Sequence, residues 1–326
     1  MHTDSLQLVR KAISFERPDR VPLLFRTDPD RSDIVGVDFS PPTGWTPPAP
    51  DEDEWGCVWA NIIGTGVGQV VTHPLENATD LKGYEFPDPH ADGRFDRARD
   101  AVARHKGKYI AGKMGISGFN LMMSLRGFEN LLVDVALGSE FLSELTAKAW
   151  TFEAGIIEEF AKCGVHGLWF FDDWGMEHSL FVHPRTWRDT FKPLYRDQFR
   201  MIHDLGMQVF LHSCGYVWDI IPDLIEIGVD VLNLEQPMIF AADGVSGIDR
   251  MASSFGGQVC FCTNPDSQCT LAHSSPAEVE EEVKHVISAF SGFGGGLIAL
   301  ADCGKDHKIL PPANIEAMES AFVRLA

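Results

Sequence analysis

The stretch "MQVFLHSCGYVWDIIPDLIEIGVDVLNLEQP", residues 207–237, decides the fold. Its apolar runs at 207–215 and 229–237 predict two buried strands, and the segment 219–228 between them predicts a short helix. A strand, a helix and a second strand in succession favour a parallel sheet. The first strand ends in His212 and Cys214, which face the same side because side chains alternate along a strand.

The same alternation of strand and helix extends over the rest of the chain. Further buried strands are predicted at 21–25, 108–115, 166–175, 258–264 and 295–304. Helices are predicted at 139–164, with a capping serine and a terminal glycine, at 183–206, with a kink at Pro193, and at 275–290 and 311–325. The length and the number of units predict a (β/α)₈ TIM barrel, an α/β fold, as a single domain over residues 1–326.

Two further features of the sequence concern a long loop and the absence of a dinucleotide-binding motif. Prolines and acids crowd "SPPTGWTPPAPDEDEWG", residues 40–56, and predict a long loop near the N-terminus. The first predicted strand is not followed by G-x-G-x-x-G, which disfavours a dinucleotide-binding fold.

Composition narrows the classes of function. A formal net charge of -20 argues against nucleic acid as a partner, because the phosphate backbone would be repelled. The sequence has neither a signal peptide pattern nor an apolar run of the roughly 18 residues that a membrane helix needs, so we expect no membrane association. Seven irregularly spaced cysteines do not resemble a disulfide framework, so we expect a cytoplasmic protein.

The ends of the predicted strands carry polar and sulfur-containing side chains. Active residues of such barrels gather at the C-terminal ends of the strands. These ends supply Asp172, Asp173 and Trp174; His212 and Cys214; Glu235 and Gln236; Cys262 and Asn264; and Asp302 and Cys303. Among residues near these ends, the candidates for substrate binding are Met114, Trp174, Glu235 and Gln236.

His212, Cys214 and Cys303 form a candidate metal site. One nitrogen and two sulfurs are typical zinc ligands, and three protein ligands leave one tetrahedral position for a substrate. Alternatively, both cysteines are small buried hydrophobic residues and His212 is a core histidine bonded to the backbone. His307 is a further ligand candidate or a loop residue.

A second group of cysteines competes with this site. Cys260, Cys262 and Cys269 have the spacing C-x-C-x₆-C. Cys262 is the next candidate for the third ligand, whereas Cys260 and Cys269 are expected to be structural.

The acidic pair in "FFDDWG" is the second chemical feature. Asp172 and Asp173 are adjacent on a strand, so only one of them should enter the barrel mouth. There it could accept a proton, orient a metal-bound histidine or bind substrate, and we expect a catalytic role. The alternative is that the pair caps the next helix.

Several blocks of the sequence resemble the uroporphyrinogen decarboxylase superfamily, and within it the corrinoid-linked zinc methyltransferases. The resemblance covers essentially the whole chain, and its most specific part is the block that begins at His212. The blocks are "FERPDRVPL" near the start, "DEWGCVW" at 53–59, "LKGYEFPDP" at 81–89, "DDWG" at 172–175, "HSCGYVWDIIPDLIEIGVDVLNLEQP" at 212–237 and "GGGLIALADCG" at 294–304. The resemblance implies a (β/α)₈ barrel.

Two branches of that superfamily differ at identifiable positions. The decarboxylases carry R-Q-A-G-R after the first strand and need no metal, whereas "LLFRTDPDR" here keeps Arg26 but not that motif. The methylcobalamin:coenzyme M methyltransferases carry a zinc site H-x-C…C, which His212, Cys214 and Cys303 match. The resemblance therefore implies zinc-dependent methyl transfer.

These observations predict a methyltransferase that moves a methyl group between a corrinoid (methylcobalamin) protein and a thiol such as coenzyme M. No segment resembles a cobalamin-binding domain, so the cobalamin is expected on a partner protein or free. Alternatives are a demethylase that passes a methyl group from a methoxylated or methylated small molecule to the corrinoid protein, a decarboxylase-like lyase, and a non-catalytic tetrapyrrole-binding barrel. A homodimer is compatible with the sequence.

Overall fold

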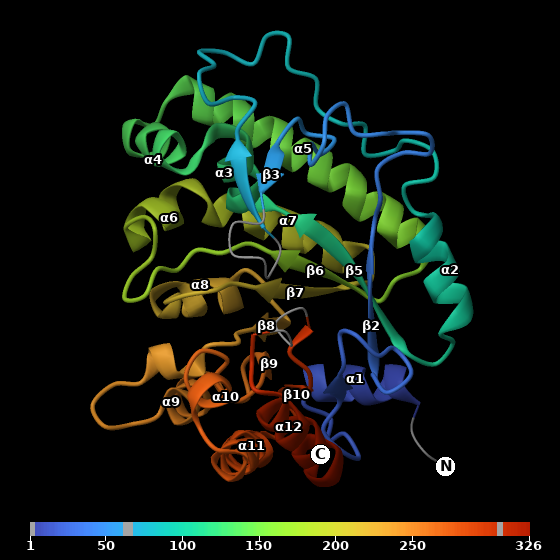
Figure 1. Cartoon of the computed structure of the whole chain (residues 1–326), viewed down its shortest axis with the longest axis vertical. Coiled ribbons are helices and arrows are strands. Elements are labelled where there is room, and N and C mark those ends of the chain that lie inside the picture. The colour runs from blue at the N-terminus through green and yellow to red at the C-terminus, as the bar shows by residue number, and fades with distance from the viewer. Residues whose placement is uncertain (1–3, 61–67, 305–308) are drawn as a thin grey trace.

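Eight parallel strands form the central sheet of the protein, which we describe from a computed structural model (Figure 1). The structure describes residues 4–60, 68–304 and 309–326. The strands follow the order β1-β10-β9-β8-β7-β6-β5-β2 and form a nearly closed barrel. They are β1 (Leu23–Leu24), β2 (Ile34–Asp38), β5 (Tyr109–Ile116), β6 (Gly167–Phe171), β7 (Gln208–His212), β8 (Val231–Asn233), β9 (Cys260–Thr263) and β10 (Leu297–Leu300).

The seam of the barrel lies between β1 and β2, and the side chain of Asp33 bridges it. The backbone N–H of Asp33 donates to the carbonyl of Leu23 at 2.8 Å. In return, the N–H of Leu23 donates to Asp33 Oδ2 at 2.8 Å. Arg20 holds both carboxylate oxygens of Asp33 at 2.7 Å. A carboxylate therefore completes the closure where strand pairing stops.

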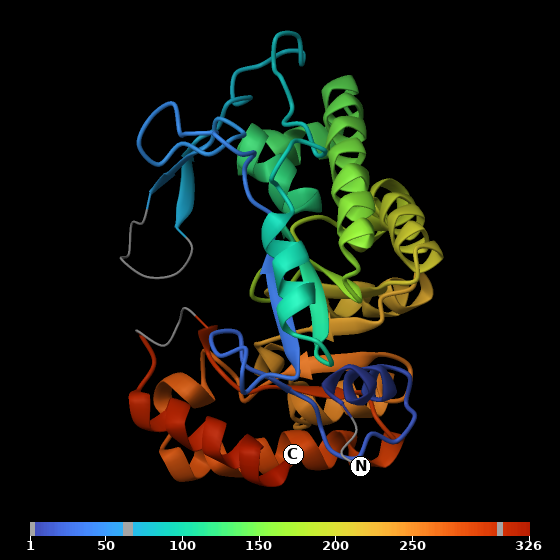
Figure 2. The same cartoon turned by 90° about the vertical axis from the view of Figure 1, so that its right-hand side faces the viewer.

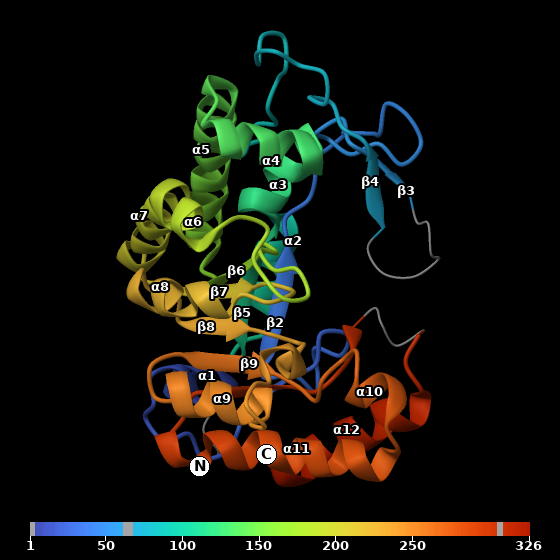
Figure 3. The same cartoon turned by 90° about the vertical axis from the view of Figure 1, so that its left-hand side faces the viewer.

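Helices cover the outside of the barrel. Figures 2 and 3 show α3, α4 and α5 on one side of the sheet and α11 with α12 on the opposite side. The helices are α1 (Ser5–Ile13), α2 (Asp96–Arg104), α3 (Gly118–Arg126), α4 (Phe128–Leu137), α5 (Glu140–Cys163), α6 (Pro184–Thr190), α7 (Lys192–Asp204), α8 (Ile221–Glu226), α9 (Gly247–Phe255), α10 (Thr270–His273), α11 (Pro276–Phe290) and α12 (Pro312–Leu325). In the described part of the chain, no helix has the length and apolar character needed to cross a bilayer.

Alternation along the strands divides the core into an inner and an outer part. Inside the barrel, one cluster contains Leu24, Trp169, Phe210 and Ile298. The intervening strand residues pack outward against the helices. This register decides which side chain at each strand end reaches the barrel mouth.

The structure confirms the barrel and the seven strands that the apolar runs predict. Ser139 caps α5 through its side chain, and Gly164 ends that helix in a left-handed conformation, as predicted. The kink expected at Pro193 is a break at Phe191, which separates α6 from α7. Residues 40–56 contain no helix or strand, as expected for the predicted loop. The sequence analysis missed β2 and the two-stranded antiparallel hairpin of β3 (Val58–Ala60) and β4 (Gln69–Thr72).

Candidate active site at the barrel mouth

The segments that follow β6 and β7 stay paired beyond the strands. The N–H of Asp172 donates to the carbonyl of His212 at 3.1 Å, and the N–H of Gly175 donates to the carbonyl of Cys214 at 3.2 Å. A side chain at Gly175 or at Gly215 would clash with the backbone of the other glycine. The glycines that end "DDWG" and "HSCG" thus allow the two segments to touch, and this contact brings Asp173 next to Cys214.

Asp173, His212 and Cys214 form a compact cluster of candidate metal ligands. One donor atom from each lies within 4.8 Å of the others, and all three side chains are half-buried. Cys214 Sγ lies 3.3 Å from His212 Nε2, and Asp173 Oδ1 lies 3.7 Å from the same nitrogen. Asp173 Oδ1 also accepts the backbone N–H of Cys214 at 2.6 Å. A nitrogen, a sulfur and an oxygen in this arrangement fit zinc.

The neighbour on β8 fixes the tautomer of His212. The Asn233 amide donates through Nδ2 to the carbonyl of Cys262 at 2.9 Å, so its Oδ1 faces His212. His212 Nδ1 lies 3.0 Å from this oxygen and must carry the hydrogen. The lone pair is therefore on Nε2, the nitrogen that points to Cys214. Holding the second ring nitrogen in this way is typical of metal-binding histidines.

Acidic side chains outnumber basic ones at the mouth. Arg26 Nη1 donates to Glu235 at 2.9 Å, and its Nε lies 3.4 Å from Asp302. Burial lowers the pKa of Arg26, but the carboxylates of Glu235 and Asp302 outweigh it and raise the pKa overall. A second cation, Lys113 on β5, lies 3.5 Å from Asp38. Both cations are thus already paired with carboxylates.

Asp172 points away from the mouth into the packing between β6 and the helices. It is fully buried, accepts the N–H of Asn120 at 2.9 Å and accepts the hydroxyl hydrogen of Tyr195. Glu153 on α5 belongs to the same buried group and accepts the N–H of Gly118 at 2.6 Å. Burial raises the pKa of Asp172 to about 8 and that of Glu153 to about 7. Of the acidic pair in "DDWG", Asp173 is therefore the one at the mouth, and a catalytic role for either residue stays a prediction.

Cys303, the predicted third ligand, is not among the residues of the described cluster. Cys303 is buried outside the barrel with Leu23, Phe25 and Ala301, and among the described residues the ligand cluster contains Asp173 in its place. Cys303 as a ligand stays a prediction from the family resemblance. His307 lies outside the described residues.

The competing cysteines are spread over different environments. Cys260 and Cys262 are fully buried inside the barrel, whereas Cys269 is exposed. Burial raises the pKa of the Cys262 thiol far above its usual range, and the nearby Glu235 adds to this shift. Cys262 as an alternative third ligand stays a prediction.

The predicted substrate-binding residues divide into two pairs. Glu235 binds Arg26 at the mouth, and Gln236 accepts the N–H of Gly215 at 3.1 Å. Met114 and Trp174 are instead buried in the outer core, where the ring of Trp174 packs against aromatic side chains of the surrounding helices. Substrate binding by all four stays a prediction.

Three residues of the site, Asn233, Lys113 and Asp38, escaped the sequence analysis. Asn233, which holds His212, is fully buried, and Lys113 reaches the mouth from β5 over Gly36. The alternation in "VLNLEQ" places Asn233 on the same face as Glu235, and this was the available signal.

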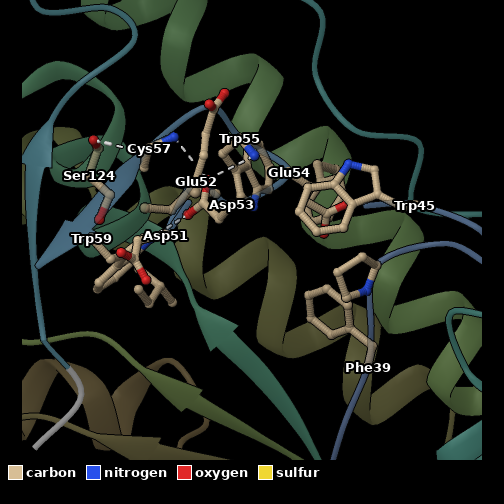
Figure 4. A pocket seen from close by; sticks show the side chains of 14 residues that line it. Phe39, Trp45, Asp51, Glu52, Asp53, Glu54, Trp55, Cys57, Trp59 and Ser124 are labelled. Carbon is tan, nitrogen blue, oxygen red and sulfur yellow. Dashed lines mark hydrogen bonds between the residues drawn. The ribbon is translucent and has the colours of Figure 1, made fainter. Parts of the chain in front are cut away.

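A pocket of about 440 Å³ adjoins the carboxyl ends of β2 and β5, the end of the barrel that holds His212 and Cys214 (Figure 4). It is bordered by Phe39, which follows β2, by Ile116 at the end of β5, and by the loop 41–59. Its size falls within the range of about 300–1,000 Å³ that is typical of small-molecule sites.

Comparisons with known proteins agree with this fold. A family model described as uroporphyrinogen decarboxylase (URO-D) matches residues 61–324. No curated protein is similar enough in sequence to count as a relative.

Among solved structures, a methyltransferase from Methanosarcina mazei has 14% sequence identity and a TM-score of 0.71, with 98% of each chain covered. A D-psicose 3-epimerase from Clostridium cellulolyticum H10 has 11% identity and a TM-score of 0.44, covering 70% of this chain and 82% of its own. A chitinase from Chromobacterium violaceum has 11% identity and a TM-score of 0.42, covering 96% and 93%.

Proposed function

The chain belongs to the uroporphyrinogen decarboxylase (URO-D) family, and on that premise we propose that it is a zinc-dependent methyltransferase. It would move a methyl group between a corrinoid carried by a partner protein and a small molecule. The observation that carries the proposal is the His212–Cys214–Asp173 cluster, held by Asn233 at the mouth of the barrel. The similarity of fold to the Methanosarcina mazei methyltransferase supports it.

His212 and Cys214 would hold the zinc ion, with Asp173 or Cys303 as the third protein ligand. Bound zinc would lower the pKa of a thiol acceptor. With a methylated donor, it would instead withdraw electrons from the atom that carries the methyl group. Asn233 keeps the lone pair of His212 on Nε2, and Gln236 fixes the backbone after Cys214. Glu235 lies 3.7 Å from His212 Nδ1 and is itself bound by Arg26. These residues orient the ligands without contributing further metal donors.

The charges at the mouth argue against decarboxylation of an acidic porphyrinogen. Such a substrate needs unpaired cations for its carboxylates. Arg26 and Lys113 are both paired, and Asp38, Asp173, Glu235 and Asp302 make the described mouth net negative. We therefore expect no decarboxylation of uroporphyrinogen.

The small molecule could be a thiol acceptor such as coenzyme M or a methylated donor. The acidic, aromatic pocket beside the mouth favours the donor, because coenzyme M carries an anionic sulfonate that these acids would repel. In this second form the enzyme demethylates a small molecule and passes the methyl group to the corrinoid protein.

Metal analysis of the purified protein tests the proposal first. We expect close to one zinc per chain in the wild type and less than a tenth of that in Cys214→Ser. Asp173→Asn and Cys303→Ser then identify the third ligand, because only the true ligand should release most of the zinc. A wild-type protein that excludes zinc at micromolar concentrations would refute the site.

An anaerobic assay with a corrinoid follows. If the enzyme methylates a thiol, the cobalt spectrum should change when methylcobalamin and the thiol are added. If it demethylates a donor, the spectrum should change when reduced cobalamin and the methylated donor are added. Loss of zinc in Cys214→Ser should abolish either change. Spectral changes that persist in zinc-free protein would contradict the role of the metal.

A further inference from the structure

The pocket beside the mouth has aromatic walls on facing sides. In Figure 4, Phe39 and Trp45 lie on one side of the open space and Trp59 lies on the other, with Trp55 between them near the top of the view. Trp55 is fixed edge-on against Phe152 at a centroid distance of 4.6 Å. Faces of aromatic rings attract cations through their quadrupole, and tryptophan does so most strongly.

Four consecutive acidic residues, 51–54, line the same pocket, and two of them have structural tasks. Asp53 accepts the indole N–H of Trp59 at 2.7 Å and two backbone N–H groups of its own loop. Glu54 forms a buried ion pair with Arg94, whose Nη1 donates at 2.8 Å. These two carboxylates therefore shape the loop and are already bonded.

The other two carboxylates, Asp51 and Glu52, have no side-chain hydrogen bond or ion pair to the described residues. The described lining contains no lysine, arginine or histidine. An anionic ligand would meet only repulsion here, and a purely apolar one would gain nothing from the acids. Aromatic faces combined with unneutralised carboxylates are the chemistry that recognises an organic ammonium ion.

We infer that this pocket binds a small organic cation that carries methyl groups on nitrogen. The inference rests on the proposed function in its second form, in which this cation is the methyl-bearing substrate. Trp45, Trp59 and Phe39 would contact the methyl groups, and Asp51 and Glu52 would supply the opposite charge. The position beside β2 and β5 places the ligand at the end of the barrel where the His212–Cys214 cluster lies.

Isothermal titration of the whole protein with two ligands of equal shape tests the inference. Choline carries a trimethylammonium group, and 3,3-dimethylbutan-1-ol replaces its nitrogen by carbon. We expect saturable binding of choline and at least roughly tenfold weaker binding of the neutral alcohol, because only the cation gains the electrostatic attraction. Equal binding of the two ligands, or no binding of choline, would overturn the inference.

Charge-neutral variants locate the site. Asp51→Asn combined with Glu52→Gln should weaken choline binding roughly tenfold and leave the alcohol unaffected. Glu85→Gln removes an exposed acid from the same region outside the pocket and should bind choline like the wild type. Unchanged choline affinity in the double variant would place any binding elsewhere. Thermal melts check folding, and the comparison of the two ligands on the wild type needs no variant.

The binding test is independent of the metal. A protein that holds zinc but does not bind choline would refute this inference and leave the proposed function standing. A protein that binds choline without holding zinc would refute the zinc-dependent function and leave the binding of an organic cation standing.

Discussion

A single amide decides how His212 can act. Asn233 is fully buried, and its Oδ1 accepts the hydrogen on Nδ1 of His212. The ring is thereby prevented from turning and from placing its hydrogen on Nε2. Partners of this kind commonly change metal affinity by about 10–100-fold when they are removed.

Asn233→Leu keeps the approximate volume but removes the acceptor, so we expect zinc affinity to fall by roughly 10–100-fold. Competition with a chromophoric chelator measures this change. Asn130→Leu, at a surface position away from the mouth, is the control and should keep wild-type affinity. Equal affinities in the two variants would show that His212 does not depend on Asn233.

At the residue scale, the sequence indicated the candidate ligands His212 and Cys214, but it did not indicate Asn233, the side chain that holds His212. Period-two alternation placed His212 and Cys214 on one face and showed that only one of the two aspartates enters the mouth. It could not show which one, because that depends on where β6 enters the barrel. It also could not place Cys303, which lies past the end of β10 where the alternation no longer applies.

The titration of Glu153 makes the stability of the protein depend on pH, and a substitution of this residue can separate its contribution from those of other groups. Burial raises its pKa from 4.5 to about 7, so the folded state holds a proton that the unfolded state releases between these values. Its stabilising contribution is therefore complete below pH 4.5 and is lost as the pH rises to about 7. The total change is on the order of 3 kcal/mol.

Glu153→Gln removes this titration, and the structure can accommodate the amide. Gln198 donates to Glu153 at 2.6 Å, while its own Oε1 is buried without a partner in the described structure. Turning the Gln198 amide by half a turn would let this oxygen accept from the amide that the substitution introduces. Denaturant melts at pH 5 and pH 8 should show wild type losing more stability than the variant. Parallel losses in the two proteins would contradict the raised pKa.

At the scale of elements, the barrel depends on its shortest strand. β1 has two residues, and Asp33 supplies the bonds to β2 that a longer ladder would make. The residues at this seam also explain why the sequence analysis did not predict β2. "IVGVD" follows two polar residues, Ser32 and Asp33, and contains Gly36, so the segment lacks the long apolar run that marked the other strands.

Asp33→Ala should destabilise the protein by about 2–4 kcal/mol, because it leaves the buried N–H of Leu23 without a partner. Urea unfolding measures the loss. Asp30→Ala, at an exposed position just before it, should be near neutral. A loss below about 0.5 kcal/mol in Asp33→Ala would mean that water replaces the carboxylate at the seam.

The loops after β6 and β7 form the second critical contact between elements. Gly215→Ala should destabilise the protein by about 1–3 kcal/mol and weaken zinc binding, because its methyl group would push Gly175 away and separate Asp173 from Cys214. Gly206→Ala is a matched control, since Gly206 has a similar φ of +78° but no described atom within 4 Å of an added Cβ. Equal effects of the two substitutions on zinc would show that backbone strain, not the clash, is responsible.

At the scale of the whole molecule, the candidate ligands tie folding to metal binding. Asp173 lies two residues after β6, and His212 ends β7. These parallel strands pair through five registered residues, and Asn233 belongs to β8, the next strand. These ligands come together only when the sheet has formed, so zinc would bind the folded state and scarcely bind the unfolded one. Zinc must then stabilise the entire barrel.

The expected gain is about 2.7 kcal/mol when free zinc is 100 times its Kd. For a chain of this size, this should raise Tm by roughly 4 °C. Melting curves of chelator-treated protein, with and without added zinc, measure the shift. Cys214→Ser should lose most of it, whereas Cys269→Ser, which removes an exposed thiol that is not part of the ligand cluster, should keep it. Magnesium should produce no comparable shift, because it prefers oxygen ligands over nitrogen and sulfur. If zinc stabilised wild type and Cys214→Ser equally, the ion would be binding elsewhere, and the mouth of the barrel would no longer be the metal centre.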